Sequence, residues 1–423
     1  MKILLLGSGG REHAFAWKIR QSAHCEALYI APGNAGTAGL GENVNIQVND
    51  FQHIANFALQ KHIDLLMVGP EEPLVHGIYD FFKNAPHLEH IAVLGPSQAA
   101  AQLEGSKAFA KQFMQEFGVP TAAYREFTAD RMDEGLQYLA EHAMPVVLKA
   151  DGLAAGKGVL ICDTVTEAQS AFRELLGGKF GAASARVVVE AFLKGIEFSV
   201  FVITDGAHYK ILPVAKDYKR IGEGDTGLNT GGMGAISNPS FVNAELLQKV
   251  EARIIQPTMA GIQARQLVYK GFIFFGLICV AGEPFVIEYN CRMGDPETEA
   301  VLPRLQNDLI ELMLAATNGT LQAIDIKMDA RTAATVVLVS GGYPGDYERG
   351  KIIHGLQEVQ QHSMVFHAGT KQSGSDVLSN GGRVFAITSL GADLQEALNK
   401  CYQSAATIQF EGKYYRRDIG FDL

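Results

Sequence analysis

One predicted strand carries three polar side chains that could share a chemical task. Residues 283–297 read E-P-F-V-I-E-Y-N-C-R-M-G-D-P-E, and the β-branched and aromatic content predicts a strand over 285–291. Because residues two apart share a face of a strand, Glu288, Asn290 and Arg292 should point the same way. The intervening side chains are expected in the core: Ile287, Tyr289 and Cys291. A carboxylate, an amide oxygen and a guanidinium suit a phosphate held by Mg²⁺, which takes oxygen ligands. The solvated face of an edge strand explains this stretch alone equally well.

The first hundred residues contain the elements that would build a binding edge. Apolar runs occupy residues 2–6, 27–30, 63–68 and 91–94, and glycine or proline follows each of them. Helical patterns separate these runs, and this alternation predicts an open parallel α/β sheet. Ligands of such sheets bind beyond the carboxyl ends of the strands, so the loops that follow the runs are candidate binding loops.

The first of these loops reads G-S-G-G-R-E-H-A and is close to a dinucleotide-binding fingerprint. Gly7 and Gly9 fit that pattern, but Glu12 stands where the third glycine belongs, which argues against NAD binding. Gly9, Gly10 and Arg11 at a helix N-terminus can still bind a phosphate through backbone amides and the helix dipole. A tight strand-to-helix turn is the other interpretation. The adjacent Arg11 and Glu12 favour a ligand.

A glycine- and alanine-rich loop joins two predicted strands in the middle of the chain. Residues 145–149 and 159–162 flank D-G-L-A-A-G-K-G, which lacks the spacing of a Walker loop and has Gly158 where that loop needs Ser or Thr. A hairpin of this kind that carries Lys157 can close over phosphates as a lid. Lys149 follows three apolar residues, which favours an anionic partner over simple exposure.

Two carboxylates and a polar segment come next. Glu190 and Glu197 lie in apolar surroundings, where sugar hydroxyls or an exocyclic amine would satisfy them. After the basic cluster at residues 216–220, residues 223–234 read E-G-D-T-G-L-N-T-G-G-M-G. We expect this segment to be a loop whose backbone amides form an anion-binding nest, rather than a disordered linker.

Acidic residues also follow the strand of the opening motif. The sequence G-D-P-E-T-E places Asp295 and Glu297 at the start of a predicted helix, where the helix dipole favours carboxylates. Helix capping alone explains Asp295. It does not explain the density of acidic and basic groups around Arg292, so this segment is expected to belong to a binding site.

Size and composition exclude several classes of protein. The chain has 423 residues, 47% hydrophobic and 19% charged, which predicts a globular protein of two to four domains. A net charge of −10 argues against a nucleic-acid or anionic-membrane surface, although phosphorylated small molecules need only a few local cations. The five cysteines show no C-x-x-C spacing, and no apolar run approaches the length of a membrane span. We therefore expect a soluble, cytoplasmic protein with reduced thiols.

Five motifs together make the chain similar to the glycinamide ribonucleotide synthetase family. They are G-S-G-G-R-E-H-A, A-P-G-N-A-G-T, K-A-D-G-L-A-A-G-K-G-V, N-T-G-G-M-G and E-Y-N-C-R-M-G-D-P-E-T, and they occur in this order along the whole chain. The resemblance implies a multi-domain α/β enzyme of the ATP-grasp superfamily. It implies an open parallel α/β substrate domain over residues 1–105 and an ATP-grasp domain over 106–327 with a lid at about 121–192. A small α+β domain over 328–423 would pack on the first domain.

The resemblance also implies an activity. Members of this family are ATP-dependent carbon–nitrogen ligases of purine biosynthesis that join glycine to 5-phosphoribosylamine through glycyl phosphate. The expected cofactors are ATP and Mg²⁺ or Mn²⁺, and the expected partners are small molecules only, with no nucleic acid or membrane and with the protein as a monomer. Three alternatives are another ATP-grasp ligase or carboxylase, such as the biotin-dependent or aminoimidazole ribonucleotide types, a nicotinamide oxidoreductase, which Glu12 disfavours, and a non-catalytic nucleotide sensor.

The same resemblance assigns roles to individual residues. ATP is expected to contact Lys107, Lys149, Lys157, Glu190, Leu193 and Glu197. The metal ion is expected at Glu288 and Asn290. The substrates are expected to contact Gly10, Arg11, Glu12, Asn34, Glu71, Asp217, Asn229, Thr230, Gly231, Gly232, Arg292 and Asp295. Catalytic roles are expected for Lys149, Asp217 and Arg292. The chain departs from the family pattern at Ala191, Lys216, Tyr218, Leu228 and Met293, which leaves the fine substrate contacts open.

Overall fold

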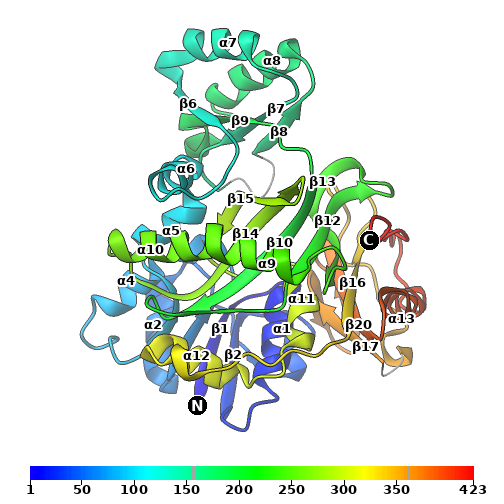
Figure 1. The fold of residues 1–423 in the computed structure, drawn as a ribbon. Helices are drawn as coiled ribbons and strands as arrows, with labels where there is room; N and C mark the ends of the chain where they lie inside the picture. The colour runs from blue at the N-terminus through cyan, green and yellow to red at the C-terminus, as the bar shows by residue number, and fades with distance from the viewer. Residues whose placement is uncertain (154–157, 360–361) are drawn as a thin grey trace.

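The computed structural model of the protein describes residues 1–153, 158–359 and 362–423. Within these ranges a sheet of 14 strands runs through the molecule, and a separate sheet of 4 strands forms the lobe at the top of Figure 1. No helix in the described ranges is long and apolar enough to cross a membrane.

The N-terminal strands form a parallel sheet that is covered on both faces. They are β1 (Lys2–Gly7), β2 (Ala27–Pro32), β3 (Glu42–Asn43), β4 (Leu65–Val68) and β5 (Ala92–Pro96). The helices are α1 (Gly10–Ile19), α2 (Phe51–Lys61), α3 (Glu71–Val75), α4 (Ile78–Lys83) and α5 (Gln98–Gly105). Ile3 and Leu5 pack with α1, whereas Leu4 and Leu6 pack with α2, so both faces of β1 are apolar. The predicted open parallel sheet is confirmed.

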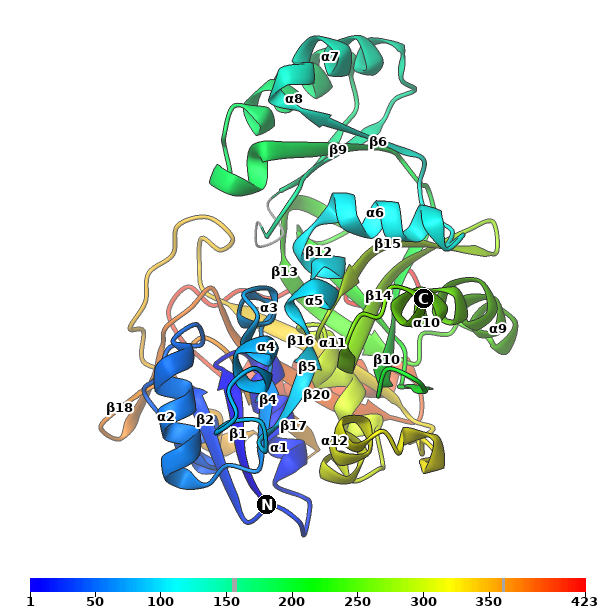
Figure 2. The ribbon, with the colours of Figure 1, turned by 90° about the vertical axis from the view of Figure 1, so that its left-hand side faces the viewer.

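The upper lobe folds around an apolar core of its own. It spans residues 124–191 and is called the lid lobe below. Its elements are β6 (Tyr124–Thr128), α7 (Met132–Glu141), β7 (Val146–Ala150), β8 (Val159–Cys162), α8 (Val165–Leu176) and β9 (Arg186–Ala191). The strand order is β6-β9-β7-β8, and Phe127, Leu148 and Phe172 are buried between the sheet and the two helices. Helix α6 (Lys107–Glu116) and α5 lie between this lobe and the N-terminal sheet (Figure 2).

The central part continues the large sheet with long antiparallel strands. These are β10 (Ile196–Thr204), β11 (Tyr209–Ile211), β12 (Ala215–Gly222), β13 (Thr226–Ser237), β14 (Tyr269–Val280) and β15 (Glu283–Asn290). The helices are α9 (Ala244–Val250), α10 (Gln256–Ala264), α11 (Glu297–Val301) and α12 (Leu309–Asn318). Strand β14 pairs antiparallel with β5, and this pairing joins the central strands to the N-terminal sheet.

Residues 223–234 do not form the predicted loop. They make the turn and most of the second strand of the β12–β13 hairpin. The pairing contains register shifts near Arg220, and Gly232 adopts a φ of +119°, a conformation that favours glycine. Glycine-rich sequence lowers strand propensity, but the segment pairs with β12, and from Gly234 onward β13 also pairs with a C-terminal strand. The loop prediction was therefore wrong.

Strand β15 departs from simple alternation at one residue. Ile287 has no partner on β14, since Gly276 opposes Glu288 and the next residue of β14 already opposes Val286. This extra residue is a β-bulge, and it leaves Ile287 half-buried at the surface of a cavity. The other two side chains expected in the core are buried: Tyr289 and Cys291. The prediction for Ile287 was wrong because the bulge interrupts the two-residue period.

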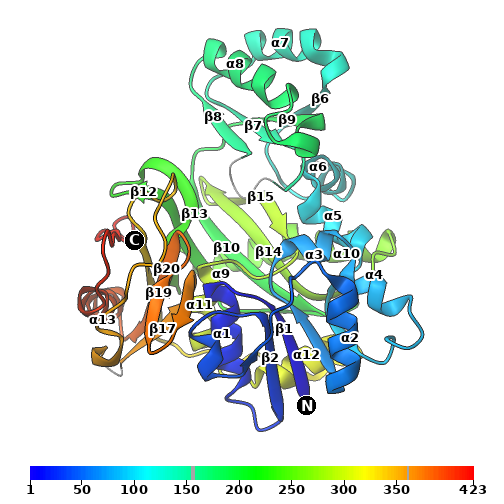
Figure 3. The same cartoon turned by 180° about the vertical axis from the view of Figure 1, so that it is seen from behind.

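The C-terminal part extends the sheet and packs against the N-terminal part. Its elements are β16 (Thr332–Val339), β17 (Ser363–His367), β18 (Thr370–Ser373), β19 (Asp376–Ser379), β20 (Arg383–Gly391) and α13 (Leu394–Thr407). The large sheet has the order β17-β20-β16-β13-β12-β10-β14-β5-β4-β1-β2-β3, with β11 beside β10 and β15 beside β14. Strand β17 lies next to α1 (Figure 3), and the His367 N–H donates to Nδ1 of His13 at 2.7 Å.

Candidate active site

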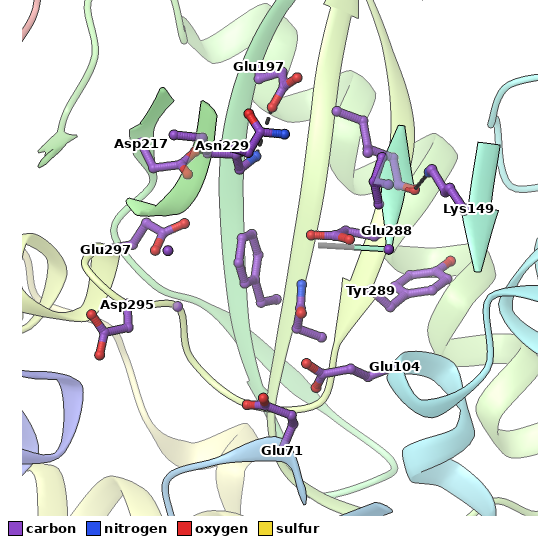
Figure 4. A pocket seen from close by; sticks show the side chains of 18 of the residues that line it. Glu71, Glu104, Lys149, Glu197, Asp217, Asn229, Glu288, Tyr289, Asp295 and Glu297 are labelled. Atoms are coloured by element: carbon purple, nitrogen blue, oxygen red, sulfur yellow. Dashed lines mark hydrogen bonds and ion pairs between the residues drawn. The ribbon is translucent and has the colours of Figure 1, made fainter. Parts of the chain in front are cut away.

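A cavity of about 860 Å³ opens where the three parts and the lid lobe meet (Figure 4). Most of the predicted site residues line it: Arg11, Glu71, Lys107, Lys149, Glu190, Glu197, Asp217, Asn229, Thr230, Gly231, Glu288, Asn290, Arg292 and Asp295. These side chains come from α1, α3, α6, the lid lobe and strands of the large sheet, so the fold gathers residues far apart in the sequence. Lys157 lies outside the described residues.

Other predicted residues in the described ranges do not line the cavity. They are Gly10, Glu12, Asn34, Leu193 and Gly232. Glu12 accepts hydrogen bonds from the Gly9 N–H at 2.7 Å and from Arg11 Nε at 2.6 Å. Asn34 donates from Nδ2 to the Ser8 carbonyl at 2.9 Å. Both side chains thus shape the loop that presents Arg11 to the cavity.

One carboxylate on the lid lobe side is held between two lysines. Glu190 Oε1 lies 2.9 Å from Lys149 Nζ, and Oε2 lies 3.0 Å from Lys111 Nζ. Lys149 also donates to the carbonyl of the bulged residue Ile287 at 3.1 Å. All three charged side chains are buried, and burial lowers the pKa of Lys111 to about 8 although Glu190 opposes the shift. The bulge and the lid lobe together therefore fix Lys149 at the cavity wall.

The row Glu288, Asn290 and Arg292 faces the cavity as predicted. Burial alone would raise the pKa of Glu288, but the charges of Lys219 and Lys149 hold it below its usual value, so the carboxylate is ionised. Asn290 Oδ1 accepts from Arg292 Nη2 at 2.9 Å, and its Nδ2 is buried with no hydrogen-bond partner among the described residues. The row thus offers two hard oxygen donors and one unsatisfied amide, which fits a cation bound together with an anion.

Two carboxylates from the N-terminal part hold Arg292 in place. Its Nε donates to Glu71 Oε2 at 3.2 Å, and its Nη2 donates to Glu104 Oε1 at 2.7 Å. Glu104 also accepts the Cys291 N–H at 2.8 Å. Burial would lower the pKa of Arg292, but Glu104 and Glu71 raise it, and Arg292 in turn helps to bring the pKa of Glu71 down to about 2 against the effect of burial. The guanidinium is therefore charged and fixed.

The opposite end of the cavity is rich in carboxyl groups. Asp295 Oδ1 pairs with Arg383 Nη1 at 3.0 Å, and Oδ2 accepts the Arg11 N–H at 3.3 Å. Glu299 is fully buried, and neither carboxyl oxygen has a donor among the described residues. Burial, and then the negative charge of Asp295, raise the pKa of Glu299 well above its usual value, so the Glu299 carboxyl is protonated.

The sequence analysis missed three charged residues that shape the site. They are Glu104, Lys111 and Arg383. Lys111 lies on a helix face with the buried residues Ala108 and Met114, a helical spacing that marks a buried charge in need of a partner. Glu104 stands in the same way among buried alanines of α5. Arg383 opens a strand and reaches Asp295 only in the folded chain, so no local signal indicates its role.

Two departures from the family pattern contact the same carboxylate. Tyr218 donates from its hydroxyl to Asp422 Oδ1 at 2.8 Å, and Lys216 Nζ lies 3.2 Å from Asp422 Oδ2. Lys216 Nζ also lies 4.6 Å from the centre of the Tyr218 ring. One acidic side chain therefore accommodates both departures, while Asp217 between them still lines the cavity.

Comparisons with known proteins agree with this architecture. Family models for phosphoribosylglycinamide synthetase match as an N domain over residues 1–104, an ATP-grasp (A) domain over 105–298 and a C domain over 333–422. The fold, the cavity and these matches define an ATP-dependent ligase of the ATP-grasp class. The chain belongs to the phosphoribosylglycinamide synthetase family.

Individual relatives support the assignment. The phosphoribosylamine–glycine ligase of Vibrio cholerae is 47% identical, over 100% of this chain and 98% of that protein. The crystal structure of the Thermotoga maritima phosphoribosylamine–glycine ligase superposes with a TM-score of 0.85 at 32% identity, covering 99% of this chain and 100% of that one. The biotin carboxylase domain of Hydrogenobacter thermophilus 2-oxoglutarate carboxylase, solved with MgADP, has a TM-score of 0.74 at 16% identity over 99% and 92% of the two chains. That likeness reflects the shared fold alone.

Proposed function

We propose that the protein joins glycine to 5-phosphoribosylamine at the expense of ATP, giving glycinamide ribonucleotide, ADP and phosphate in purine biosynthesis. The observation that carries the proposal is the single cavity in which Arg11 of the N-terminal loop and the row Glu288, Asn290 and Arg292 meet. A phosphate-bearing substrate and a nucleotide would thus bind side by side. The name of the 47% identical relative supports the same reaction.

The proposal includes the organisation of the protein. We assign the substrate domain to residues 1–105, the ATP-grasp domain to 106–327 and the C-terminal domain to 328–423. A monomeric state is part of the same proposal. A cytoplasmic location follows from the proposed pathway and is part of the same hypothesis.

The nucleotide would occupy the side of the cavity nearest the lid lobe. Lys107 and Lys149 line that side and would neutralise its phosphates. Glu288 and Asn290 would hold Mg²⁺ or Mn²⁺, which supplies positive charge beside the phosphates when bound. The ionised Glu288 and the amide oxygen of Asn290 are hard donors of the kind that such ions prefer.

In this reaction the protein mainly positions the substrates and stabilises the charges that develop on them. The glycine carboxylate attacks the γ-phosphorus of ATP, and glycyl phosphate and ADP result. Arg292, fixed by Glu71 and Glu104, is placed to stabilise the charge of the transferred phosphoryl group. The amine of phosphoribosylamine, held through its phosphate by Arg11, then attacks the acyl carbon. Water would hydrolyse glycyl phosphate, so exclusion of water from the cavity would favour the amide.

The experiment that tests this proposal is ADP release with each component omitted in turn. Phosphoribosylamine is generated in the assay from ribose 5-phosphate and ammonia. ADP release should require the divalent metal ion, ATP, glycine and phosphoribosylamine together. Release that depends on bicarbonate instead of glycine would favour a carboxylase, and nucleotide binding without release would favour a sensor.

A further inference from the structure

Glu297 occupies the part of the cavity where the two amine-bearing substrates would meet. It is the first residue of α11, and its side chain lies between Asp217 and Asp295 (Figure 4). Asp217 is among the expected substrate contacts, and Asp295 accepts the backbone N–H of Arg11, the residue proposed to hold the phosphate of phosphoribosylamine. Glu297 lines the cavity with only 3% of its surface exposed, so a bound substrate would contact it with little water present.

No cation in the part of the chain that the structure describes forms an ion pair with the carboxylate of Glu297. The cations around it pair with other carboxylates: Lys219 with Glu197 at 2.8 Å, Arg292 with Glu104 at 2.7 Å and Arg383 with Asp295 at 3.0 Å. The hydrogen bond that Glu297 accepts from another side chain comes from Ser199 Oγ at a long 3.4 Å. A buried carboxylate with a purely structural role would be expected to have stronger partners. A Cβ atom at Gly294 would lie 2.3 Å from Glu297 Oε2, so glycine at that position keeps space for the carboxylate.

Amide formation between these substrates has a specific need for a base. The glycine amine must stay protonated so that it does not react, whereas the attacking amine must lose a proton as the new bond forms. We propose that Glu297 accepts this proton from the nitrogen of phosphoribosylamine. The inference rests on the function proposed above and names a further catalytic residue for it.

For a neutral amine, the proposed step forms one bond, breaks one bond and transfers one proton to Glu297. The nitrogen lone pair forms the C–N bond at the acyl carbon, and one N–H proton moves to a carboxylate oxygen of Glu297. The bond between the acyl carbon and the phosphate oxygen then breaks, and its electron pair leaves with the phosphate. The departing phosphate takes up one proton, which Glu297 can return, so the carboxylate is restored for the next turnover.

The electrostatic surroundings of Glu297 suit this task. The titratable groups that face it are Asp217 and Lys219 from β12, Arg292 after β15, Asp295 and Glu299 around α11, and Arg383 from β20. Burial, and then the negative charge of Asp217, raise its pKa to about 7. A general base is most effective when its pKa lies near the working pH, because it is then both available and able to hold the proton.

The test compares Glu297→Gln with wild type in two reactions. With phosphoribosylamine, kcat should fall by about 100-fold or more, the range expected for loss of a general base. With hydroxylamine as the acceptor, glycine-dependent ADP release and hydroxamate formation should stay close to wild type, because this nucleophile reacts without a base. Glu311→Gln is the matched control, since Glu311 also lies in the first turn of a helix but on the surface. Unchanged turnover with phosphoribosylamine, or equal losses with both acceptors, would overturn the proposal.

A second pair of measurements separates catalysis from structure. The wild-type kcat/KM for phosphoribosylamine should fall below an apparent pKa near 7, and this acidic limb should disappear in Glu297→Gln. Glu297→Asp should keep the limb with reduced activity, and thermal unfolding of both variants should match wild type. An acidic limb that persists in Glu297→Gln contradicts the inference. If the wild type itself releases no ADP in response to glycine, it is the proposed function that fails.

Discussion

The two ends of the cavity differ in how their buried charges are paired. At the nucleotide end, near the lid lobe, buried cations pair with carboxylates, as Lys149 and Lys111 do with Glu190. At the amine end, beside α11, Glu297 has no paired cation within residues 1–153, 158–359 and 362–423, and Glu299 is protonated. The first end is built to receive phosphates, and the second is built to receive groups that carry or release protons. The two kinds of substrate site therefore differ in whether their charged groups have partners, and not only in which charges they carry.

The largest effect is expected from Glu288→Ala at the nucleotide end. Loss of an ionised oxygen donor beside the phosphates should lower kcat by roughly 100- to 1000-fold or more at ordinary Mg²⁺ concentration. The protein should remain folded, because Glu288 takes part in no ion pair among the described residues that Ala would break. Steady-state amide formation checks the rate, and circular dichroism checks the fold. Amide formation close to wild type would remove the metal assignment.

The next largest effect is expected from Lys111→Met, because this substitution removes one of the two lysines that pair with Glu190 at the nucleotide end. Glu190 would keep Lys149 but lose its second partner in a buried setting, so we expect a loss of about 2–3 kcal/mol in the free energy of unfolding. Urea denaturation measures it. Lys179→Met is the matched control, since the Lys179–Glu174 pair is exposed and should cost less than about 1 kcal/mol. Equal losses in both variants would contradict the contrast between the two ends.

Arg11→Ala should raise the KM for phosphoribosylamine without raising the KM for ATP. Removing the guanidinium should raise the KM for phosphoribosylamine by about 10- to 100-fold, the worth of a charge-assisted hydrogen bond, and should leave the KM for ATP within about twofold. Initial-rate kinetics with each substrate varied in turn provide the measurement. A parallel rise in both KM values would exclude the N-terminal loop from selective substrate recognition.

Glu299→Gln should have the smallest effect on stability, in contrast to Lys111→Met. The amide replaces a carboxyl that is already neutral, because burial and Asp295 raise the pKa of Glu299 well above its usual value. The free energy of unfolding near neutral pH should therefore change by less than about 1 kcal/mol. A loss as large as that of Lys111→Met would mean that Glu299 is ionised and held by a cation, and the contrast between the two ends would fail.

The sequence predicts which side chains of a strand face the site better than it predicts the strands and residues with which they pair. The two-residue period placed Glu288, Asn290 and Arg292 on one face. The structure agrees, since β15 pairs regularly from Glu288 to its end at Asn290 and all three side chains line the cavity. The same period failed at Ile287, since a bulge depends on how β14 pairs and leaves no mark in the composition of β15. The β12–β13 hairpin was missed for a related reason, as tertiary pairing overrides the low strand propensity of glycine.

The other features that could not be predicted from the sequence are ion pairs between residues far apart in the chain. Arg292 was predicted in the site, but its fixed orientation depends on Glu71 and Glu104, which are more than 180 residues away in the chain. Arg383 meets Asp295 across 88 residues for the same reason. A periodic pattern shows which face of an element is polar, whereas a tertiary contact shows which charge it faces. Only the second distinguishes the nucleotide end from the amine end.

The most direct test of the central claim follows oxygen from glycine into phosphate. Glycine with both carboxylate oxygens replaced by ¹⁸O is turned over with ATP and phosphoribosylamine, and the released phosphate is analysed by mass spectrometry. If the glycine carboxylate is activated by phosphoryl transfer in this cavity, the phosphate should carry about one ¹⁸O atom per molecule, because the acyl carbon–oxygen bond breaks. Phosphate without label would contradict activation of glycine and, with it, the assignment of the two ends of the cavity.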